Sequence, residues 1–237
     1  MIAVISSTIY PSVQTTRDGA RSWNTPESRL EQTQKTIQFL VDAGISEIYL
    51  ADNSGVNWIS TTDTLLKPAK VYIFNQYQYQ NKGISEIYLL LSILEFIPEN
   101  EPIIKISGRY FMEKNPFQNS IECDLQTKIY RYGIFRSSMS TRCYWVKNKE
   151  VYKVFLKTTL CEIFAYSSRI VGPASLAKII YNSIFPELDK YPYDDPTCSI
   201  ELASARAIRR HGFINHEINT LGIEGCVAGN PHDILKE

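Results

Sequence analysis

The chain has no excess of charge of either sign. Lysine and arginine together number 25, and so do aspartate and glutamate, which gives the 237-residue sequence a formal net charge of zero at pH 7. Proteins that bind nucleic acid along its backbone generally carry a basic excess. We therefore expect no nucleic-acid partner, and any recognition of an anion must depend on a local group of cations.

Paired cysteines and long apolar runs are also missing. The five cysteines are widely spaced and include no CxxC pair, which disfavours a disulfide framework or a structural zinc site and suits a reducing compartment. The longest apolar stretch, residues 87–97, is too short to span a bilayer. The N-terminus lacks the basic region of a signal peptide. We therefore expect a cytoplasmic protein without a transmembrane segment.

Several familiar motifs of nucleotide and acyl chemistry do not occur. No GxGxxG follows the first apolar run, which disfavours a dinucleotide-dependent dehydrogenase, and no GxxxxGK[ST] indicates a P-loop. No GxSxG is present, and the three histidines leave little room for a hydrolase triad. A nucleotide enzyme with this sequence must bind its ligand by other means.

Four apolar, β-branched runs each stop abruptly at polar or charged residues, and they cover residues 2–8, 46–54, 70–76 and 102–110. Continuous apolar runs are typical of parallel strands buried on both faces. Ligands of open parallel sheets bind at the carboxyl ends of the strands. We therefore expect the polar residues that follow these runs to converge on one crevice.

Helical patterns at 27–44 and 83–97 separate these runs, which predicts an α/β protein with a mostly parallel central sheet flanked by helices. The heptamer GISEIYL occurs at 44–50 and again at 83–89. We assign the first copy to a strand, and the second to a helix because its apolar pattern continues past strand length.

The second half of the chain is less regular. Segments within 128–147 are typical of strands, 148–165, 172–184 and 199–213 of helices, and 221–229 of a short strand. No linker divides the sequence, so we predict a single domain over 1–237, with a donor half (1–112) and a smaller acceptor half (113–237).

This layout resembles the Rossmann-like GT-A fold of nucleotide-sugar glycosyltransferases, over about residues 2–110 and more weakly at 196–213 and 224–233. The resemblance implies that Ser7 and Thr8 contact the nucleobase and ribose. It also implies that Asp52, with Asn53 beside it, hydrogen-bonds the nucleoside. The alternative is that Asp52 and Asn53 only form a turn.

Two groups of cations resemble the diphosphate site of such enzymes. Lys82 and Gly83 open a helix, where an ammonium and free backbone N–H groups attract a diphosphate. Lys105 and Arg109 stand in KISGRY, where most GT-A enzymes carry a DxD that holds Mg²⁺ or Mn²⁺. This departure from the family pattern predicts that Lys105 and Arg109 neutralise the leaving phosphate directly and without a metal, with Mg²⁺ or Mn²⁺ as the alternative. Ordinary solvated or ion-paired cations would give the same pattern.

The segment DDPTCSIELASARAIRRHGF resembles the helix start at which inverting, family-2-like enzymes place their catalytic carboxylate. The resemblance implies Glu201 as general base, with Asp195 as second choice. The alternative is a structural acid in a first helical turn. His232 resembles a late histidine that some of these enzymes use on the metal or the diphosphate.

The resemblance implies a hexosyltransferase-type enzyme. It would transfer a sugar from a nucleoside-diphosphate sugar to a glycan or lipid-linked saccharide during surface polysaccharide or glycan biosynthesis. A sugar nucleotidyltransferase is one alternative, although the loop after the first strand contains only Gly19 instead of a glycine-rich run. A non-catalytic glycan- or nucleotide-binding module is the other.

Overall fold

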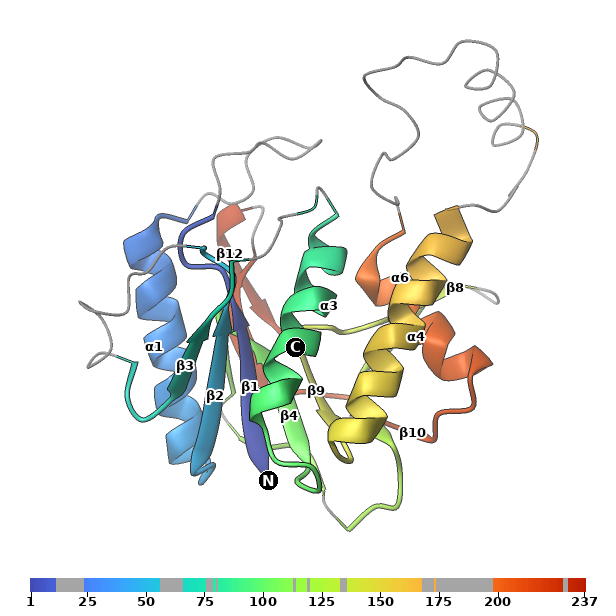
Figure 1. The fold of residues 1–237 in the computed structure, drawn as a ribbon, viewed down its shortest axis with the longest axis horizontal. Coiled ribbons are helices and arrows are strands. Elements are labelled where there is room, and N and C mark those ends of the chain that lie inside the picture. The colour runs from blue at the N-terminus through green and yellow to red at the C-terminus, as the bar shows by residue number, and fades with distance from the viewer. Residues whose placement is uncertain are drawn as a thin grey trace.

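The computed structural model describes residues 1–11, 24–55, 66–75, 79, 81–112, 114–118, 120–132, 136–167, 173, 198–227 and 230–237. Seven of the strands form one sheet in the order β10-β6-β9-β4-β1-β2-β3 (Figure 1). Their bounds are β1 Ile2–Ser7, β2 Glu47–Asp52, β3 Lys70–Ile73, β4 Ile103–Ser107, β6 Leu125–Thr127, β9 Cys143–Val146 and β10 Asn215–Glu217.

Strand β1 lies at the centre of the parallel part of this sheet. It pairs in parallel with β2 on one side and with β4 on the other, and β2 pairs in parallel with β3. Strand β9 runs antiparallel to both β4 and β6, and β10 is parallel to β6. The prediction of a mostly parallel central sheet is therefore confirmed, and β9 is the strand that departs from it.

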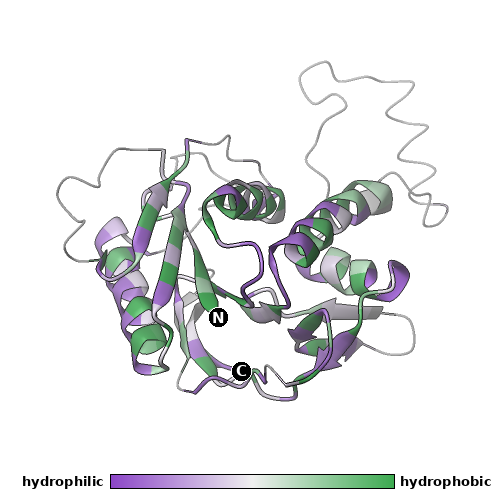
Figure 2. Ribbon diagram, turned by 60° about the horizontal axis from the view of Figure 1, so that its bottom comes forward, coloured by the Kyte–Doolittle hydropathy of each residue, from purple (hydrophilic) through white to green (hydrophobic). Residues whose placement is uncertain are grey.

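Helices cover both faces of the sheet, and their bounds are α1 Pro26–Asp42, α3 Lys82–Ile93, α4 Lys149–Ser167 and α6 Ile200–Arg210, with a 3₁₀ turn η2 at Leu94–Phe96. Alternate residues of β1 point to opposite faces. Ile5 packs in a core cluster with Ile37 of α1, whereas Val4 packs in a second cluster with Ile84 of α3. Figure 1 shows α3 and α4 side by side in front of the strands, and Figure 2 shows hydrophobic and hydrophilic bands along the helices.

The two copies of GISEIYL adopt the structures assigned to them. The first enters β2 after Gly44, whose φ of +80° suits the turn that ends α1, and the second lies within α3. Asn81 caps α3, since its side chain accepts a hydrogen bond from the Gly83 N–H at 2.9 Å. Neighbouring sequence, and not the heptamer itself, decides between strand and helix.

Two small sheets complete the described structure. Strands β5 (Tyr110–Met112), β11 (Ile223–Val227) and β12 (Asn230–Lys236) form one, and β7 (Ile129–Tyr132) pairs with β8 (Arg136–Met139). The strands expected within 128–147 and 221–229 are thus present. Strands β5, β6, β10 and β12 were not expected from the sequence. The helix expected at 172–184 falls almost wholly outside the described residues, as only residue 173 is described there.

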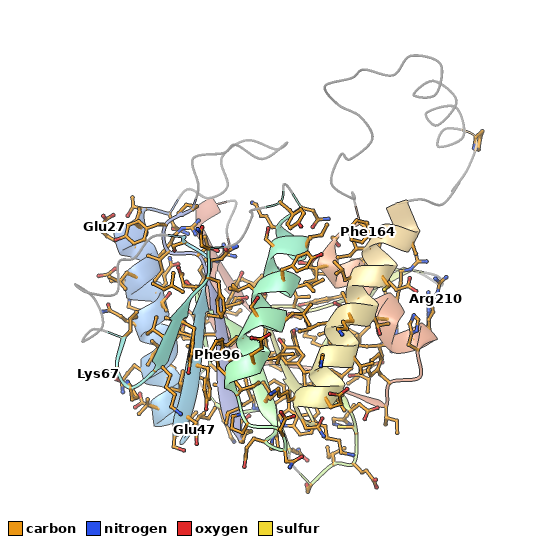
Figure 3. The ribbon with its side chains drawn as sticks, in the orientation of Figure 1. Glu27, Glu47, Lys67, Phe96, Phe164 and Arg210 are labelled. Carbon is orange, nitrogen blue, oxygen red and sulfur yellow. The ribbon has the colours of Figure 1, made fainter. Side chains whose placement is uncertain are left out.

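Helix α6 is fixed to α4 by a group of charges around Glu162. Its carboxylate accepts hydrogen bonds from Arg206 at 3.1 Å and from Arg210 at 3.2 Å, and His211 lies at 3.4 Å. Burial raises the pKa of Glu162, but these hydrogen bonds outweigh it and hold the pKa below its ordinary value. Figure 3 labels Arg210 on α6. These contacts hold the C-terminal half of α6 against α4.

Among the described residues, no helix has both the length and the apolar character needed to cross a membrane.

Candidate functional site

A pocket of about 150 Å³ lies at the carboxyl ends of β1 and β4, between the N-terminal ends of α1 and α3. The chain leaves β1 through α1 to β2 on one side of it, and β4 lies on the other side. Open α/β sheets bind ligands at such switch points. The described residues that line the pocket are Ser6, Ser7, Thr8, Pro11, Arg29, Thr33, Asn53, Lys82, Ser85, Glu86, Leu89, Ser107, Gly108 and Arg109.

The ends of β1 and β4 form the floor of this pocket. The Gly108 N–H donates to the Ser6 carbonyl at 2.9 Å, so the ends of the two strands stay paired up to the pocket wall. A Cβ on Gly108 would lie 3.0 Å from Thr33 Oγ1 of α1, so glycine permits the close approach of helix and strand. Ser7 and Thr8, both predicted from the sequence, line the pocket at the end of β1.

Three cationic side chains line the pocket from three different elements. Lys82 is the first residue of α3, Arg109 stands in the turn between β4 and β5, and Arg29 comes from α1. Arg29 is 8% exposed and donates to the carbonyl oxygens of Thr8 and Asn24, so it holds the chain after β1 in place. Lys82 and Arg109, both predicted from the sequence, therefore lie on one pocket.

The turn that carries Arg109 depends on a glycine in another strand. Gly225 of β11 pairs with Tyr110 of β5, and a Cβ on Gly225 would lie 2.2 Å from the Arg109 carbonyl oxygen. Only glycine allows this approach, because backbone cannot yield as a flexible side chain can. The position of Arg109 is therefore set by the small sheet at the far end of the sequence.

Lys105 does not line the pocket. Its side chain is fully buried, and its ammonium forms an ion pair with Glu86 and donates to Ser107 Oγ at 3.1 Å and to the Thr141 carbonyl. Glu86 lines the pocket in its place. The ammonium of Lys105 thus contacts Glu86 of the pocket wall, whereas the sequence suggested that Lys105 binds the diphosphate directly.

Sequence reasoning missed Glu86. It lies one helical turn after Lys82 and was not among the site residues predicted from the sequence. A single acid within that run of isoleucines and leucines was the available signal, because burying a carboxylate is costly unless it is paired.

Asp52 lies beneath the pocket wall. It is fully buried, and its carboxylate accepts hydrogen bonds from the Ile9 N–H and the Ser54 N–H, both at 2.9 Å. These are the contacts of the turn alternative, and they join the ends of β1 and β2. Asn53 lines the pocket, and its backbone N–H donates to the Ser7 carbonyl at 3.0 Å. Of this pair, Asn53 is thus the residue that lines the pocket.

Gly83 is buried where α3 meets α6. Its N–H already donates to the Asn81 side chain, and a Cβ on it would lie 2.7 Å from Ile200 Cβ. Asn81 also donates to the Cys198 carbonyl at 3.0 Å. Packing between the two helix starts therefore accounts for this glycine, and its N–H does not point to the diphosphate role that the sequence suggested.

Replacing Gly83 by alanine tests this packing. Alanine favours a helix over glycine by about 1 kcal/mol, but forcing a methyl against Ile200 costs about 1–3 kcal/mol. We expect the clash to prevail, so that urea unfolding of Gly83→Ala shows a lower free energy of unfolding. A variant as stable as the wild type would show that the two helix starts move apart easily.

None of the remaining predicted residues is among the described residues that line the pocket. Glu201 stands in the first turn of α6, where Thr141 Oγ1 donates to its carboxylate over a long 3.4 Å. Asp195 lies outside the described residues, and the side chain of His232, in β12, is not described either. The catalytic assignment of these three residues stays a prediction.

The described lining residues of the pocket offer few ligands for a divalent cation. Hard cations such as Mg²⁺ take several oxygen ligands, usually including carboxylates. Of the described lining residues only Glu86 is acidic, and one of its two carboxylate oxygens is already paired with the buried ammonium of Lys105. In the described part of the chain, no three His, Cys, Asp or Glu side chains gather in one place.

No protein-family model and no curated protein sequence matches this chain. Solved structures do match its fold. The nucleoside-diphosphate-sugar pyrophosphorylase of Vibrio cholerae is 12% identical, covers 97% of this chain and 96% of its own, and has a TM-score of 0.48. The inositol-1-phosphate CTP transferase of T. maritima is 11% identical over 92% of this chain and 85% of its own, with a TM-score of 0.49.

A glycosyltransferase involved in the glycosylation of the major capsid of PBCV-1 is 11% identical, covers 93% of this chain and 84% of its own, and has a TM-score of 0.42. The solved structures that match this chain thus include a glycosyltransferase beside a pyrophosphorylase and a CTP transferase. Likeness at these identities and TM-scores concerns the fold alone, so an assignment of activity has to rest on the pocket.

Proposed function

We propose that the protein is a glycosyltransferase that transfers a sugar from a nucleoside-diphosphate sugar to a glycan or lipid-linked saccharide acceptor in surface polysaccharide or glycan biosynthesis. The observation that supports this most directly is that Lys82 and Arg109 line one pocket at the switch point of the sheet. Two cations from separate elements suit a diphosphate, because each can bind oxygens of a different phosphate.

The proposed reaction is a single displacement with inversion. An acceptor hydroxyl attacks the anomeric carbon, the bond from that carbon to the phosphate oxygen breaks, and its electron pair stays on the diphosphate. Lys82 and Arg109 stabilise the charge that develops there, which is the interaction that speeds such a step. The hydroxyl proton passes to a general base, for which Glu201 is our first candidate and Asp195 our second.

The donor site is proposed to work without a metal ion, because its cations lie where charge neutralisation is needed. Ser7, Thr8 and Asn53 would contact the nucleoside at the ends of β1 and β2. We place the enzyme in the cytoplasm, where its four described cysteines, all free, would stay reduced.

A thermal-shift panel of UDP, GDP, CMP and dTDP, each with Mn²⁺ and with EDTA, tests this proposal. A ligand at about a hundred times its dissociation constant stabilises the fold by about 2.7 kcal/mol, which is readily seen. We expect one nucleoside diphosphate to stabilise the protein equally with EDTA. If a nucleotide stabilises the protein only when Mn²⁺ is present, the metal-free site is overturned. If no nucleotide stabilises the protein under either condition, the donor site is overturned.

Product analysis separates the proposal from its alternatives. A glycosyltransferase slowly transfers sugar to water and releases a nucleoside diphosphate from the donor. A sugar nucleotidyltransferase instead joins a sugar phosphate to a nucleoside triphosphate, and pyrophosphate is released from the triphosphate. A binding module gives neither product. Nucleoside diphosphate released from the sugar nucleotide is the expected result.

A further inference from the structure

Glu86 is the one acidic side chain among the described lining residues of the pocket, whose other charged residues are the cations Arg29, Lys82 and Arg109. Its Oε1 accepts hydrogen bonds from Ser6 Oγ at 3.0 Å and from the ammonium of Lys105. Within the described part of the chain, its Oε2 has no hydrogen-bond partner. The Glu86 side chain is 24% exposed, whereas that of Lys105 is not exposed at all. One carboxylate oxygen is therefore fixed, and the other is available to a ligand.

Stability alone does not account for this ion pair. Burying an ammonium is costly, and a pair such as Lys105 and Glu86 can often be replaced by apolar residues without loss of stability. The pair also orients Glu86 rigidly, because two donors hold Oε1 from the strands below. A rigid acceptor on a pocket wall suits recognition of a ligand, since its geometry need not be reorganised on binding.

The chemistry of Glu86 limits what can bind beside it. An ionised carboxylate only accepts hydrogen bonds, and it repels phosphate. Lys82 lies four residues earlier on α3, so the two side chains share one helix face about 6 Å apart along the axis. A ligand that contacts both must therefore carry an anionic group and, a few bonds away, a hydrogen-bond donor.

We propose that Oε2 of Glu86 accepts a hydrogen bond from a sugar hydroxyl of the donor nucleotide while Lys82 and Arg109 hold its diphosphate. This inference rests on the proposed function and makes Glu86 a specificity-determining residue of that site. The hydroxyl belongs to the ribose or to the transferred sugar, which offer the same chemistry. Lys105 and Ser6 act as positioning residues for Glu86.

Removing ligand hydroxyls and the carboxylate separately tests the contact. Affinities would be measured by calorimetry for UDP, GDP, ADP and CDP, for their 2′,3′-dideoxy counterparts, for their glucose and galactose esters, and for inorganic pyrophosphate. Glu86→Gln keeps an oxygen for Lys105 but loses the charge. Glu95→Gln removes the same charge from an exposed position just beyond α3 and serves as the matched control.

In the wild type and in Glu95→Gln, the hydroxyl should improve affinity by about tenfold or more, as hydrogen bonds to charged groups do. In Glu86→Gln this ratio should fall to about one, while pyrophosphate still binds. A lost preference for ribose over dideoxyribose assigns the hydroxyl to the ribose, and a lost gain from the hexose assigns it to the transferred sugar.

The inference is overturned, while the donor site stands, if the hydroxyl improves affinity as much in Glu86→Gln as in the wild type. It is also overturned if the hydroxyl does not improve affinity in the wild type. Failure of the wild type to bind pyrophosphate or any nucleotide overturns both. If Glu86→Gln does not fold, Glu86→Asp replaces it. Aspartate keeps a negative charge for Lys105 but withdraws the carboxylate by one methylene, and the same loss of hydroxyl preference is expected.

Discussion

Replacing Arg109 by alanine should lower the turnover of the donor sugar nucleotide by about 10²–10³-fold, the loss typical of removing one group that stabilises transition-state charge. Arg109 is partly exposed at the pocket wall. Its removal leaves no buried partner unpaired among the described residues, so the free energy of unfolding should change little. The two effects should therefore separate, with catalysis strongly impaired and stability nearly intact.

Two control variants sharpen this measurement. Arg109→Lys keeps the charge but loses the planar fork that binds phosphate oxygens in pairs, so an intermediate loss is expected. Arg131→Ala removes an exposed arginine whose partner is Glu217, and should leave turnover unchanged. Nucleoside diphosphate release gives the rate, and urea unfolding gives the stability. Wild-type turnover in Arg109→Ala would remove Arg109 from the site.

The sequence could predict the residues of the pocket that follow strand ends. Ser7, Thr8 and Arg109 each stand directly after a continuous apolar run, and parallel strands bring such positions to one edge of the sheet. Lys82 was instead predicted from the resemblance to family-2-like enzymes, and α3 does begin at this residue. The positions of Ser7, Thr8 and Arg109 depend only on local pattern and on the parallel sheet, both of which can be recognised in one sequence.

Side-chain direction was the part that the sequence could not give. Lys105 and Arg109 stand four residues apart in KISGRY, yet one side chain is fully buried and the other lines the pocket. Along a strand, alternate residues face opposite sides, so the direction of Lys105 depends on the register of β4 and on which helix covers that face. Its partner Glu86 comes from α3, and only the packed fold brings the two together.

The fold also depends on residues far along the chain. Strands β5, β6 and β10 contain three residues each, too few for a period to be recognised. Gly225 shapes the turn of Arg109 from more than a hundred residues away. Contacts of this kind are set by tertiary packing, and a local reading of the sequence contains no signal for them.

Of the substitutions predicted here to affect stability, Lys105→Met should cause the largest loss, about 3–5 kcal/mol in the free energy of unfolding at pH 7. Methionine fills similar space but leaves the Glu86 carboxylate without its counter-charge and the Thr141 carbonyl without a donor. A loss of this size is a large part of the stability of an ordinary domain. Urea unfolding, followed by circular dichroism, measures it.

A double-mutant cycle with Glu86 decides whether the ion pair is the cause. Glu86→Leu alone leaves the buried ammonium of Lys105 without a counter-charge, so this variant too should destabilise the fold. With both changes no charge is left unpaired. The double variant should therefore lose less free energy of unfolding than the sum of the two single losses, by about 2 kcal/mol. Strictly additive losses would mean that Lys105 stabilises the fold through packing and Thr141 alone. In that case the pair does not hold Glu86 at the pocket wall, and the orientation of the carboxylate would have to come from Ser6.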